Sequence, residues 1–157
     1  MKRINLCELL IFIFSAELVG ALSALLAGNM TEFYGTLVKP ALSPPGWLFP
    51  IVWTILYSLM GLSAYLIYRS NAAQSEKKNA LIIYAAQLFV NFLWSVVFFR
   101  FKSLWLAVAI IIILLALIAW VLLVFRKISP VAAYLNIPYL IWTLFTTYLT
   151  VSILVLN

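Results

Sequence analysis

Residues 31–61 read TEFYGTLVKPALSPPGWLFPIVWTILYSLMG, a polar segment rich in proline that runs directly into an apolar, aromatic-rich stretch. Pro40, Pro44 and Pro45 fall within six residues. Proline fixes φ and has no backbone N–H to donate, so this segment is predicted to be an ordered loop rather than a helix. It belongs to the only long connection in the chain, residues 28–46, and we expect that connection to act as a lid.

The rest of the chain has the composition of a membrane protein. Of its 157 residues, 67% are hydrophobic and 9% are charged, which leaves too little polar surface to cover a water-soluble core. Apolar runs long enough to cross roughly 30 Å of hydrocarbon occur at residues 6–27, 47–68, 80–99, 104–125 and 131–156. The sequence therefore predicts an all-α integral membrane protein: a five-transmembrane-helix bundle that forms one domain, residues 1–157, with a long loop between helices 1 and 2.

Lysine and arginine are divided unequally between the two sides of this bundle. Seven lie on the side of the N-terminus and three on the other side: Lys2, Arg3, Arg69, Lys77, Lys78, Arg126 and Lys127 against Lys39, Arg100 and Lys102. The positive-inside bias then places the N-terminus in the cytoplasm and the proline-rich loop outside, in what we expect to be a bacterial cell membrane. Because the charges are scattered over short loops, contact with anionic lipid is expected and nucleic-acid binding is not.

Several kinds of catalytic and metal site are missing from the sequence. The chain has no histidine, which removes the usual haem ligand, zinc ligand and general base. Its single cysteine, Cys7, cannot form an intramolecular disulfide. No nucleophilic triad, paired-carboxylate site or glycine-rich phosphate loop is present either. We therefore predict no metal site and no obligatory cofactor.

Polar and aromatic residues recur at helical spacing in three of the predicted spans. They are Trp53, Tyr57 and Gly61 in the second, Gln87, Asn91 and Ser95 in the third with Trp94 beside them, and Tyr139, Trp142, Thr146 and Thr150 in the fifth. Buried amides and hydroxyls are costly at membrane depth unless they pair or line a cavity, which favours a pocket between helices two, three and five. The alternative is that the aromatic residues anchor the helices at the interface and the polar ones join neighbouring helices.

The first span carries small residues and two carboxylates. Small residues recur every four positions at Ala16, Gly20, Ala24 and Gly28. This pattern predicts close approach of another helix, either in the same chain or in a second copy. Glu8 is expected at the cytoplasmic interface near Lys2 or Arg3, whereas Glu17 lies deep enough to need a partner.

Three segments together resemble the translocator protein family, also called the tryptophan-rich sensory protein (TspO/MBR) or peripheral-type benzodiazepine receptor family. They are KPALSPPGWLFPIVWTILYSLMG at 39–61, QLFVNFLWSVVFF at 87–99 and IPYLIWTLFTTYLT at 137–150. The resemblance implies a five-helix bundle, usually a homodimer, whose pocket opens toward the first loop. Its ligands would be porphyrins, isoquinoline-carboxamide and benzodiazepine-type drugs and, in some members, cholesterol.

The resemblance also implies which residues bind the ligand. They are Tyr34, Pro44, Trp53, Tyr57, Asn91, Trp94, Ser95, Trp142 and Thr146. The chain departs from the family pattern at Phe33 and Leu42, where relatives often have tryptophan, and at Thr146 and Thr150. The lid has thus lost indole surface, and ligand preference is expected to differ. Sterol recognition through the cholesterol motif of the animal proteins is not expected, since that motif needs a basic residue near the C-terminus and none follows Lys127.

Three functions remain open from the sequence. The first is a receptor, sensor or transporter that binds tetrapyrroles such as porphyrin or haem, and similar flat apolar ligands. The second is a porphyrin-degrading enzyme that uses light and oxygen, with Trp53 and Trp142 as catalytic candidates. The third is a structural or partner-regulating membrane protein. Without histidine, haem would be held by its ring, so porphyrins with and without iron are expected to bind comparably.

Overall fold

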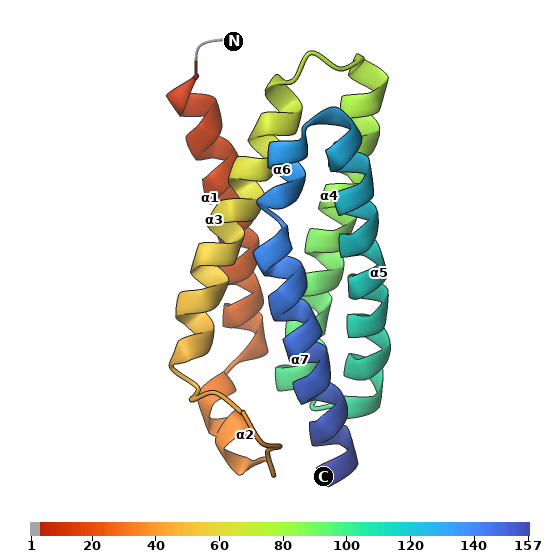
Figure 1. Cartoon of the computed structure of the whole chain (residues 1–157). Helices are drawn as coiled ribbons and strands as arrows, with labels where there is room; N and C mark the ends of the chain where they lie inside the picture. The colour runs from red at the N-terminus through yellow and green to blue at the C-terminus, as the bar shows by residue number, and fades with distance from the viewer. Residues whose placement is uncertain (1–3) are drawn as a thin grey trace.

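The computed structural model describes residues 4–157, which fold into one helical bundle (Figure 1). In chain order its elements are α1 (Leu6–Ala27), α2 (Met30–Thr36), α3 (Leu48–Arg69), α4 (Gln74–Ser95), the π-helical turn η1 (Val96–Arg100), α5 (Leu104–Ile128), α6 (Pro130–Tyr134) and α7 (Ile137–Leu156). Five helical segments are long and apolar enough to cross a membrane: α1, α3, α4 with η1, α5, and α6 with α7. The predicted all-α fold with five spans is therefore confirmed.

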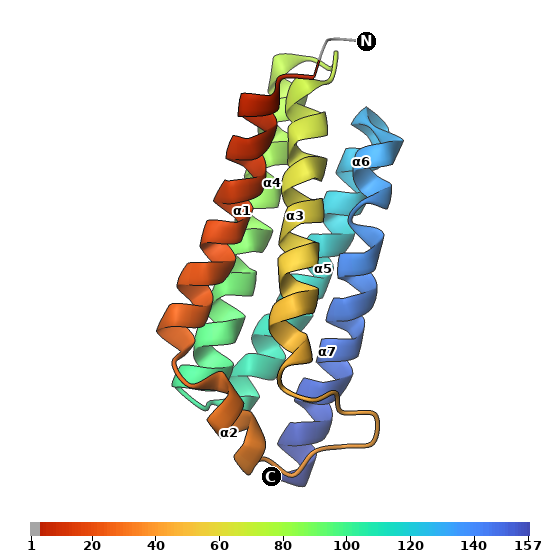
Figure 2. The same ribbon diagram turned by 90° about the vertical axis from the view of Figure 1, so that its left-hand side faces the viewer.

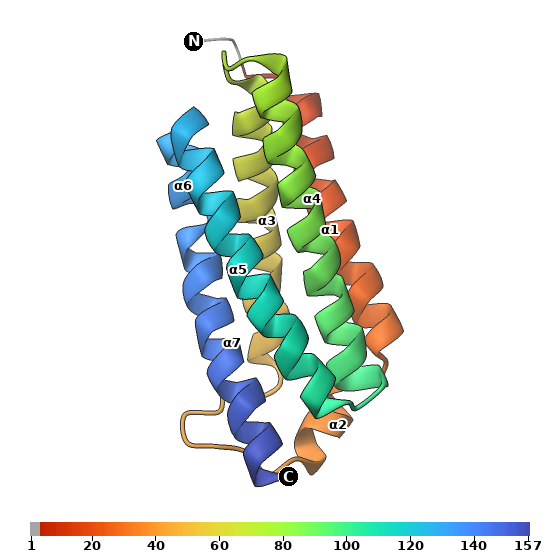
Figure 3. The ribbon, with the colours of Figure 1, turned by 90° about the vertical axis from the view of Figure 1, so that its right-hand side faces the viewer.

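The five spans run side by side, and the short helix α2 lies at the end of the bundle where the chain finishes (Figure 1). Figure 2 shows α1 against α3, with α2 below them. Seen from the opposite side, α5 lies against both α4 and α7 (Figure 3). The described chain begins at the other end of the bundle (Figure 1), so an odd number of spans separates its two ends.

Polar side chains form hydrogen bonds with the backbone at the start of α4 and at a break in the last span. α4 begins at Gln74, six residues before the predicted start, because Glu76 accepts from the Ala73 N–H and extends the helix beyond its apolar run. The last span is divided into α6 and α7. At this break, the Asn136 amide donates to the Ala132 carbonyl oxygen at 2.9 Å and to Ser63 Oγ at 2.6 Å. Asn136 thus provides a hydrogen-bond donor for a backbone carbonyl group at the break, and it links the break to α3.

The small residues of α1 face α3 in the same chain. Ala16 is fully buried, and Gly20 lies so close to the Tyr57 ring that a Cβ atom would overlap it. From the other side, a Cβ atom at Gly61 would lie 2.6 Å from Ile13 Cα. Of the two possibilities that the sequence left open, the stripe is therefore used for packing within the chain.

The first loop differs from its prediction. Met30–Thr36 forms the helix α2, capped where Asn29 Oδ1 accepts from the Glu32 N–H at 3.2 Å, so the prediction of a non-helical loop is wrong for this part. The proline-containing part is not helical. It is tied to α7 by the Asn157 amide, whose Nδ2 donates to the Val38 carbonyl oxygen at 2.9 Å while its Oδ1 accepts from the Val38 N–H at 3.0 Å. The connection is ordered, as predicted for a lid.

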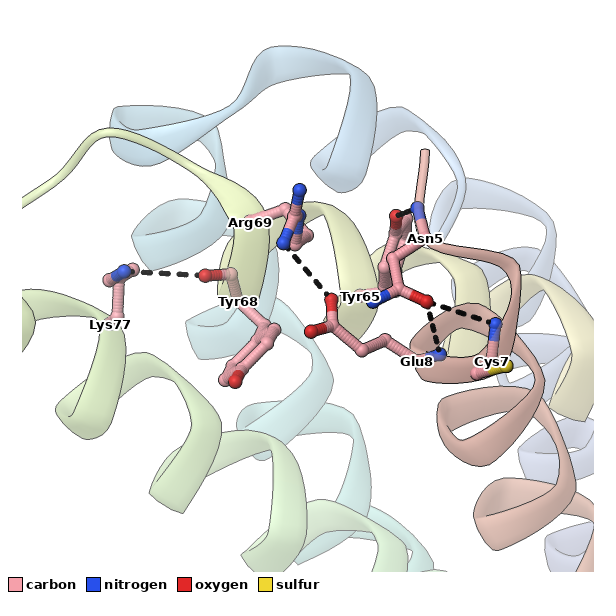
Figure 4. Close-up of polar contacts among 7 residues, drawn as sticks. All are labelled: Asn5, Cys7, Glu8, Tyr65, Tyr68, Arg69 and Lys77. Carbon is pink, nitrogen blue, oxygen red and sulfur yellow. Dashed lines mark hydrogen bonds and ion pairs between the residues drawn. The ribbon is translucent and has the colours of Figure 1, made fainter. Parts of the chain in front are cut away.

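The opposite end of the bundle is held by polar contacts between α1 and α3 (Figure 4). Glu8 pairs with Arg69 at 3.2 Å, and the Asn5 N–H donates to the Tyr65 hydroxyl at 3.0 Å. Lys2 and Arg3, the partners predicted for Glu8, lie outside the described residues. The Glu8–Arg69 pair is partly exposed, and solvent-accessible ion pairs contribute at most about 1 kcal/mol.

Candidate functional site

A cavity of about 250 Å³ lies in the half of the bundle nearer α2. We call it the aromatic cavity. It is lined by Glu17, Gly20, Ala21, Ser23 and Ala24 of α1, Met30, Thr31 and Tyr34 of α2, Gly46, Phe49, Pro50, Trp53, Thr54 and Tyr57 on the α3 side, and Trp94, Ser95 and Phe99 of α4 and η1. Its walls are mainly aromatic and aliphatic with a few polar groups, which is the usual make-up of a small-molecule site.

Two of the three predicted helices line the cavity. The sequence placed a pocket between helices two, three and five; the second and third, which are α3 and α4 with η1, do line it, but α1 and α2 take the place predicted for the fifth. Of the predicted ligand-binding residues, the structure brings together five around it: Tyr34, Trp53, Tyr57, Trp94 and Ser95. Four others lie outside its lining: Pro44, Asn91, Trp142 and Thr146. The prediction that Trp53, Asn91 and Trp142 line one cavity is thus wrong.

The fifth span is excluded because its polar and aromatic groups are used in packing. Thr146 Oγ1 donates to the Trp142 carbonyl oxygen of its own helix at 2.8 Å. The Trp142 ring meets Phe49 edge-on, with centroids 5.9 Å apart. Phe49 lines the cavity and Trp142 does not, so Trp142 contacts the cavity wall without being part of it.

Asn91 acts from behind the cavity wall. It is fully buried, and its Nδ2 donates to the Tyr57 hydroxyl at 3.0 Å. Its Oδ1 has no partner among residues 4–157. Because the Tyr57 ring lines the cavity, Asn91 fixes the position of a wall residue without reaching the cavity itself.

Three polar groups of the cavity wall can direct a ligand. Trp94 is buried, and its indole N–H has no acceptor among the described residues. Ser95 adds a hydroxyl one residue further along the same helix. Glu17 adds a carboxylate, whose Oε1 accepts from Ser58 Oγ at 2.8 Å. A buried donor without a partner is costly, so the Trp94 N–H is suited to a ligand acceptor.

Tyr34 closes the end of the cavity at the lid. Its hydroxyl donates to the Pro44 carbonyl oxygen at 3.0 Å, and its ring meets Phe49 edge-on at 5.3 Å. Burial raises the pKa of this hydroxyl, and a hydrogen bond with Ser43 only partly opposes the shift, so Tyr34 remains a donor at neutral pH. The Lys39 ammonium donates to the Tyr34 carbonyl oxygen at 2.9 Å. Pro44, although outside the lining, thus fixes the lid through Tyr34.

The α1 wall was missed by the sequence-based prediction of the pocket. Gly20 and Ala24 were interpreted as a packing surface, and Glu17 only as a residue in need of a partner. All three line the cavity, and the space that a side chain at Gly20 would take is filled by the Tyr57 ring, which is itself part of the cavity wall. Phe99 was missed too; it lies in η1, where the Phe101 N–H bonds to the Val96 carbonyl oxygen five residues back, a widened turn that often occurs at functional sites.

A second, larger hollow of about 990 Å³ lies at the opposite end of the bundle, around Tyr65, Arg69, Asn79 and Lys127. Its lining contains one aromatic residue, so it lacks the flat apolar walls of the aromatic cavity. No cluster of three or more potential metal-ligating side chains occurs in the part of the chain that the structure describes. The aromatic cavity is therefore the better candidate for an organic ligand.

Comparison with known proteins places the chain in a membrane-protein family. The sequence profile of the TspO/MBR family matches residues 11–156. The chain belongs to the TspO/MBR family. It is 38% identical over 125 residues to the tryptophan-rich protein TspO of Chlorobaculum tepidum, which covers 80% of this chain and 79% of that protein.

Two further TspO/MBR relatives come from distant organisms. The tryptophan-rich sensory protein of Cereibacter sphaeroides is 39% identical over 127 residues, covering 80% of this chain and 77% of that protein. The human translocator protein is 34% identical over 123 residues, covering 78% of this chain and 73% of that protein. Membership of the TspO/MBR family, with five apolar helices, establishes an integral multi-pass membrane protein and supports a role as a membrane sensor or receptor.

Proposed function

We propose that this protein is a membrane sensor, receptor or transporter that binds flat apolar ligands in the aromatic cavity. The proposed ligands are porphyrins and other tetrapyrroles, and isoquinoline-carboxamide and benzodiazepine-type drugs. The observation that carries the proposal is an aromatic-lined cavity between membrane helices, closed at one end by Tyr34. Relatives named sensory protein and translocator protein support it.

The cavity residues have distinct parts in this proposal. Trp53 and Tyr57 present ring surfaces from α3, with centroids 5.7 Å apart, against which a flat ligand would pack. The unpaired N–H of Trp94 would donate to a carbonyl or similar acceptor on the ligand, and the Ser95 hydroxyl would add a second directional contact. Packing area thus supplies most of the affinity, and the two polar groups set the orientation.

The size of the cavity distinguishes between ligands. Its volume of about 250 Å³ lies just below the range of about 300–1,000 Å³ usual for ligand sites, which suits a small ring system directly. A whole porphyrin is larger, so we propose that one edge of the macrocycle enters while the rest extends between α1 and α3. Thr54 and Ala21 line this side of the cavity and are exposed on the outer face of the bundle.

The proposal includes the orientation of the protein, its membrane and its oligomeric state. Arg69, Lys77, Lys78, Arg126 and Lys127 lie toward the end of the bundle opposite α2, which supports a cytoplasmic N-terminus, an external lid and contact with anionic lipid. Bacterial relatives support a bacterial cell membrane. We also propose a homodimer, which would use an outer helix face, because the small-residue stripe of α1 already packs against α3.

Titration of the purified protein with protoporphyrin in darkness tests the proposal. We expect saturable binding with an intact Soret band, and comparable affinity for the iron-containing ring because the chain has no histidine. Trp53→Phe should weaken binding several-fold, whereas Trp105→Phe, which changes an exposed tryptophan outside the lining, should leave it unchanged. Equal affinities in both variants would contradict the proposed site.

The same titration under illumination separates the enzyme alternative. Loss of the Soret band that is saturable, needs oxygen and disappears in Trp53→Phe would favour porphyrin degradation. Trp142, the other catalytic candidate, does not line the cavity, so of the two candidates Trp53 would be the one next to the macrocycle, with Trp94 also in the wall. A partner-regulating protein would show a phenotype that follows its level in the membrane and does not change in cavity variants.

A further inference from the structure

We propose that the aromatic cavity also takes flat aromatic ligands that carry a positive charge, and that the Glu17 carboxylate binds the charged group. This inference rests on the proposed function, because it adds a chemical class to the ligands that the same cavity takes. It begins from the position of Glu17, the twelfth of the 22 residues of α1. At 1.5 Å per residue this carboxylate lies roughly 17 Å from the start of the helix, near the middle of the hydrocarbon.

Among residues 4–157, Glu17 has a hydrogen-bond partner but no counter-ion. Ser58 Oγ donates to its Oε1 at 2.8 Å. The ion pair found in this part of the chain joins Arg69 to Glu8, at the far end of α1. A carboxylate at membrane depth without a cation is costly and usually belongs to a site where a cation or a proton is supplied. The hydroxyl of Ser58 is a neutral donor, so it orients the carboxylate without supplying a positive charge.

The surroundings of Glu17 are those of a cation site. The carboxylate lines the same cavity as Trp53 and Tyr57, whose rings lie one above the other on α3. A ring face attracts a cation, and the attraction strengthens when water is excluded. Gly20, one turn along α1, lets the Tyr57 ring lie directly against the helix that carries Glu17. The carboxylate and the two rings thus line the same cavity from α1 and α3, two helices that lie side by side (Figure 2).

The competing interpretation is that Glu17 and Ser58 only join α1 to α3. A hydrogen bond of this kind would be kept by glutamine, which has the same shape and an acceptor oxygen in the same place. Glu17→Gln therefore removes the charge while it preserves the link between the helices. Under the proposal the variant loses cation affinity, and under the competing interpretation it behaves as wild type.

The test uses two fluorescent tricyclic probes of the same shape, N-methylacridinium, which is permanently cationic, and methylanthracene, which is neutral. We expect Glu17→Gln to weaken N-methylacridinium binding about tenfold or more, the effect of losing a contact to a charged group. Methylanthracene affinity should change less than about twofold, because this neutral probe makes no charged contact with residue 17. Glu8→Gln, on the same helix but outside the cavity, should leave both affinities unchanged.

The remaining outcomes are decisive in different ways. Ser58→Ala, which removes the hydrogen bond and keeps the carboxylate, should retain the preference for the cationic probe. Equal losses for the two probes in Glu17→Gln, or no loss for either, would overturn the inference while leaving the cavity as a neutral ligand site. If neither probe bound saturably to the wild type, the proposed function itself would be contradicted.

Discussion

Replacing Gly61 with alanine should weaken the packing of α1 against α3. A Cβ atom at this position would lie 2.6 Å from Ile13 Cα and 2.7 Å from the Phe12 carbonyl oxygen, both of them backbone atoms that cannot turn aside. The helices would have to separate by about 0.8 Å before the shorter contact reached 3.4 Å, the start of ordinary van der Waals contact. Overpacking of this kind costs about 1–3 kcal/mol.

The measurement is thermal unfolding of the purified protein in detergent. A loss of about 1–3 kcal/mol should lower the melting temperature by roughly 2–12 °C for a chain of this length. Gly35→Ala is the matched control, since a Cβ atom there meets nothing within 4 Å. Alanine should leave that helix unchanged or stabilise it by up to about 1 kcal/mol. A Gly61→Ala protein as stable as wild type would refute the close contact between α1 and α3.

Three further substitutions test single contacts. Tyr139→Phe removes the hydroxyl that donates to Gln87 Oε1 at 2.8 Å and should cost about 1–3 kcal/mol in thermal unfolding; no loss would contradict that bond. Asn136→Ala removes the amide that bridges the α6–α7 break to α3 and should cost a similar amount, with wild-type stability counting against the bridge. Tyr34→Phe breaks the bond to the Pro44 carbonyl oxygen and should speed ligand release in stopped-flow experiments; an unchanged release rate would mean that the loop is a passive connector.

The sequence predicted those parts of the fold that depend on the length of the apolar runs. The five spans were found because an apolar run long enough to cross the membrane is a direct physical requirement. The start of α4 was missed because its first turns are polar and are held by the Glu76 side chain. Helix α2 was missed although its signal was present, since Asn29 followed three residues later by Glu32 is a helix-start pattern.

The candidate site was harder to predict than the fold. Four-residue spacing showed correctly that Asn91 and Thr146 face inward, where both are buried. Spacing does not say whether an inward side chain meets a cavity or another side chain, and these two hydrogen-bond to Tyr57 and to the Trp142 carbonyl oxygen. The small residues of α1 were interpreted as a packing surface, and Gly20 does pack against the Tyr57 ring, but Gly20 and Ala24 also line the cavity. Separating these cases requires the positions of neighbouring helices.

Filling the aromatic cavity tests the central claim most directly. Ala24 lines the cavity from α1, and its neighbour Leu25 points outward with 76% of its surface exposed. Ala24→Trp should therefore occupy the space that a ligand needs, while Leu25→Trp adds the same side chain on the outer face. We predict that Ala24→Trp abolishes saturable binding of protoporphyrin and of an isoquinoline-carboxamide, and that Leu25→Trp binds both as wild type does. Wild-type affinity in Ala24→Trp, with the protein folded, would contradict the account.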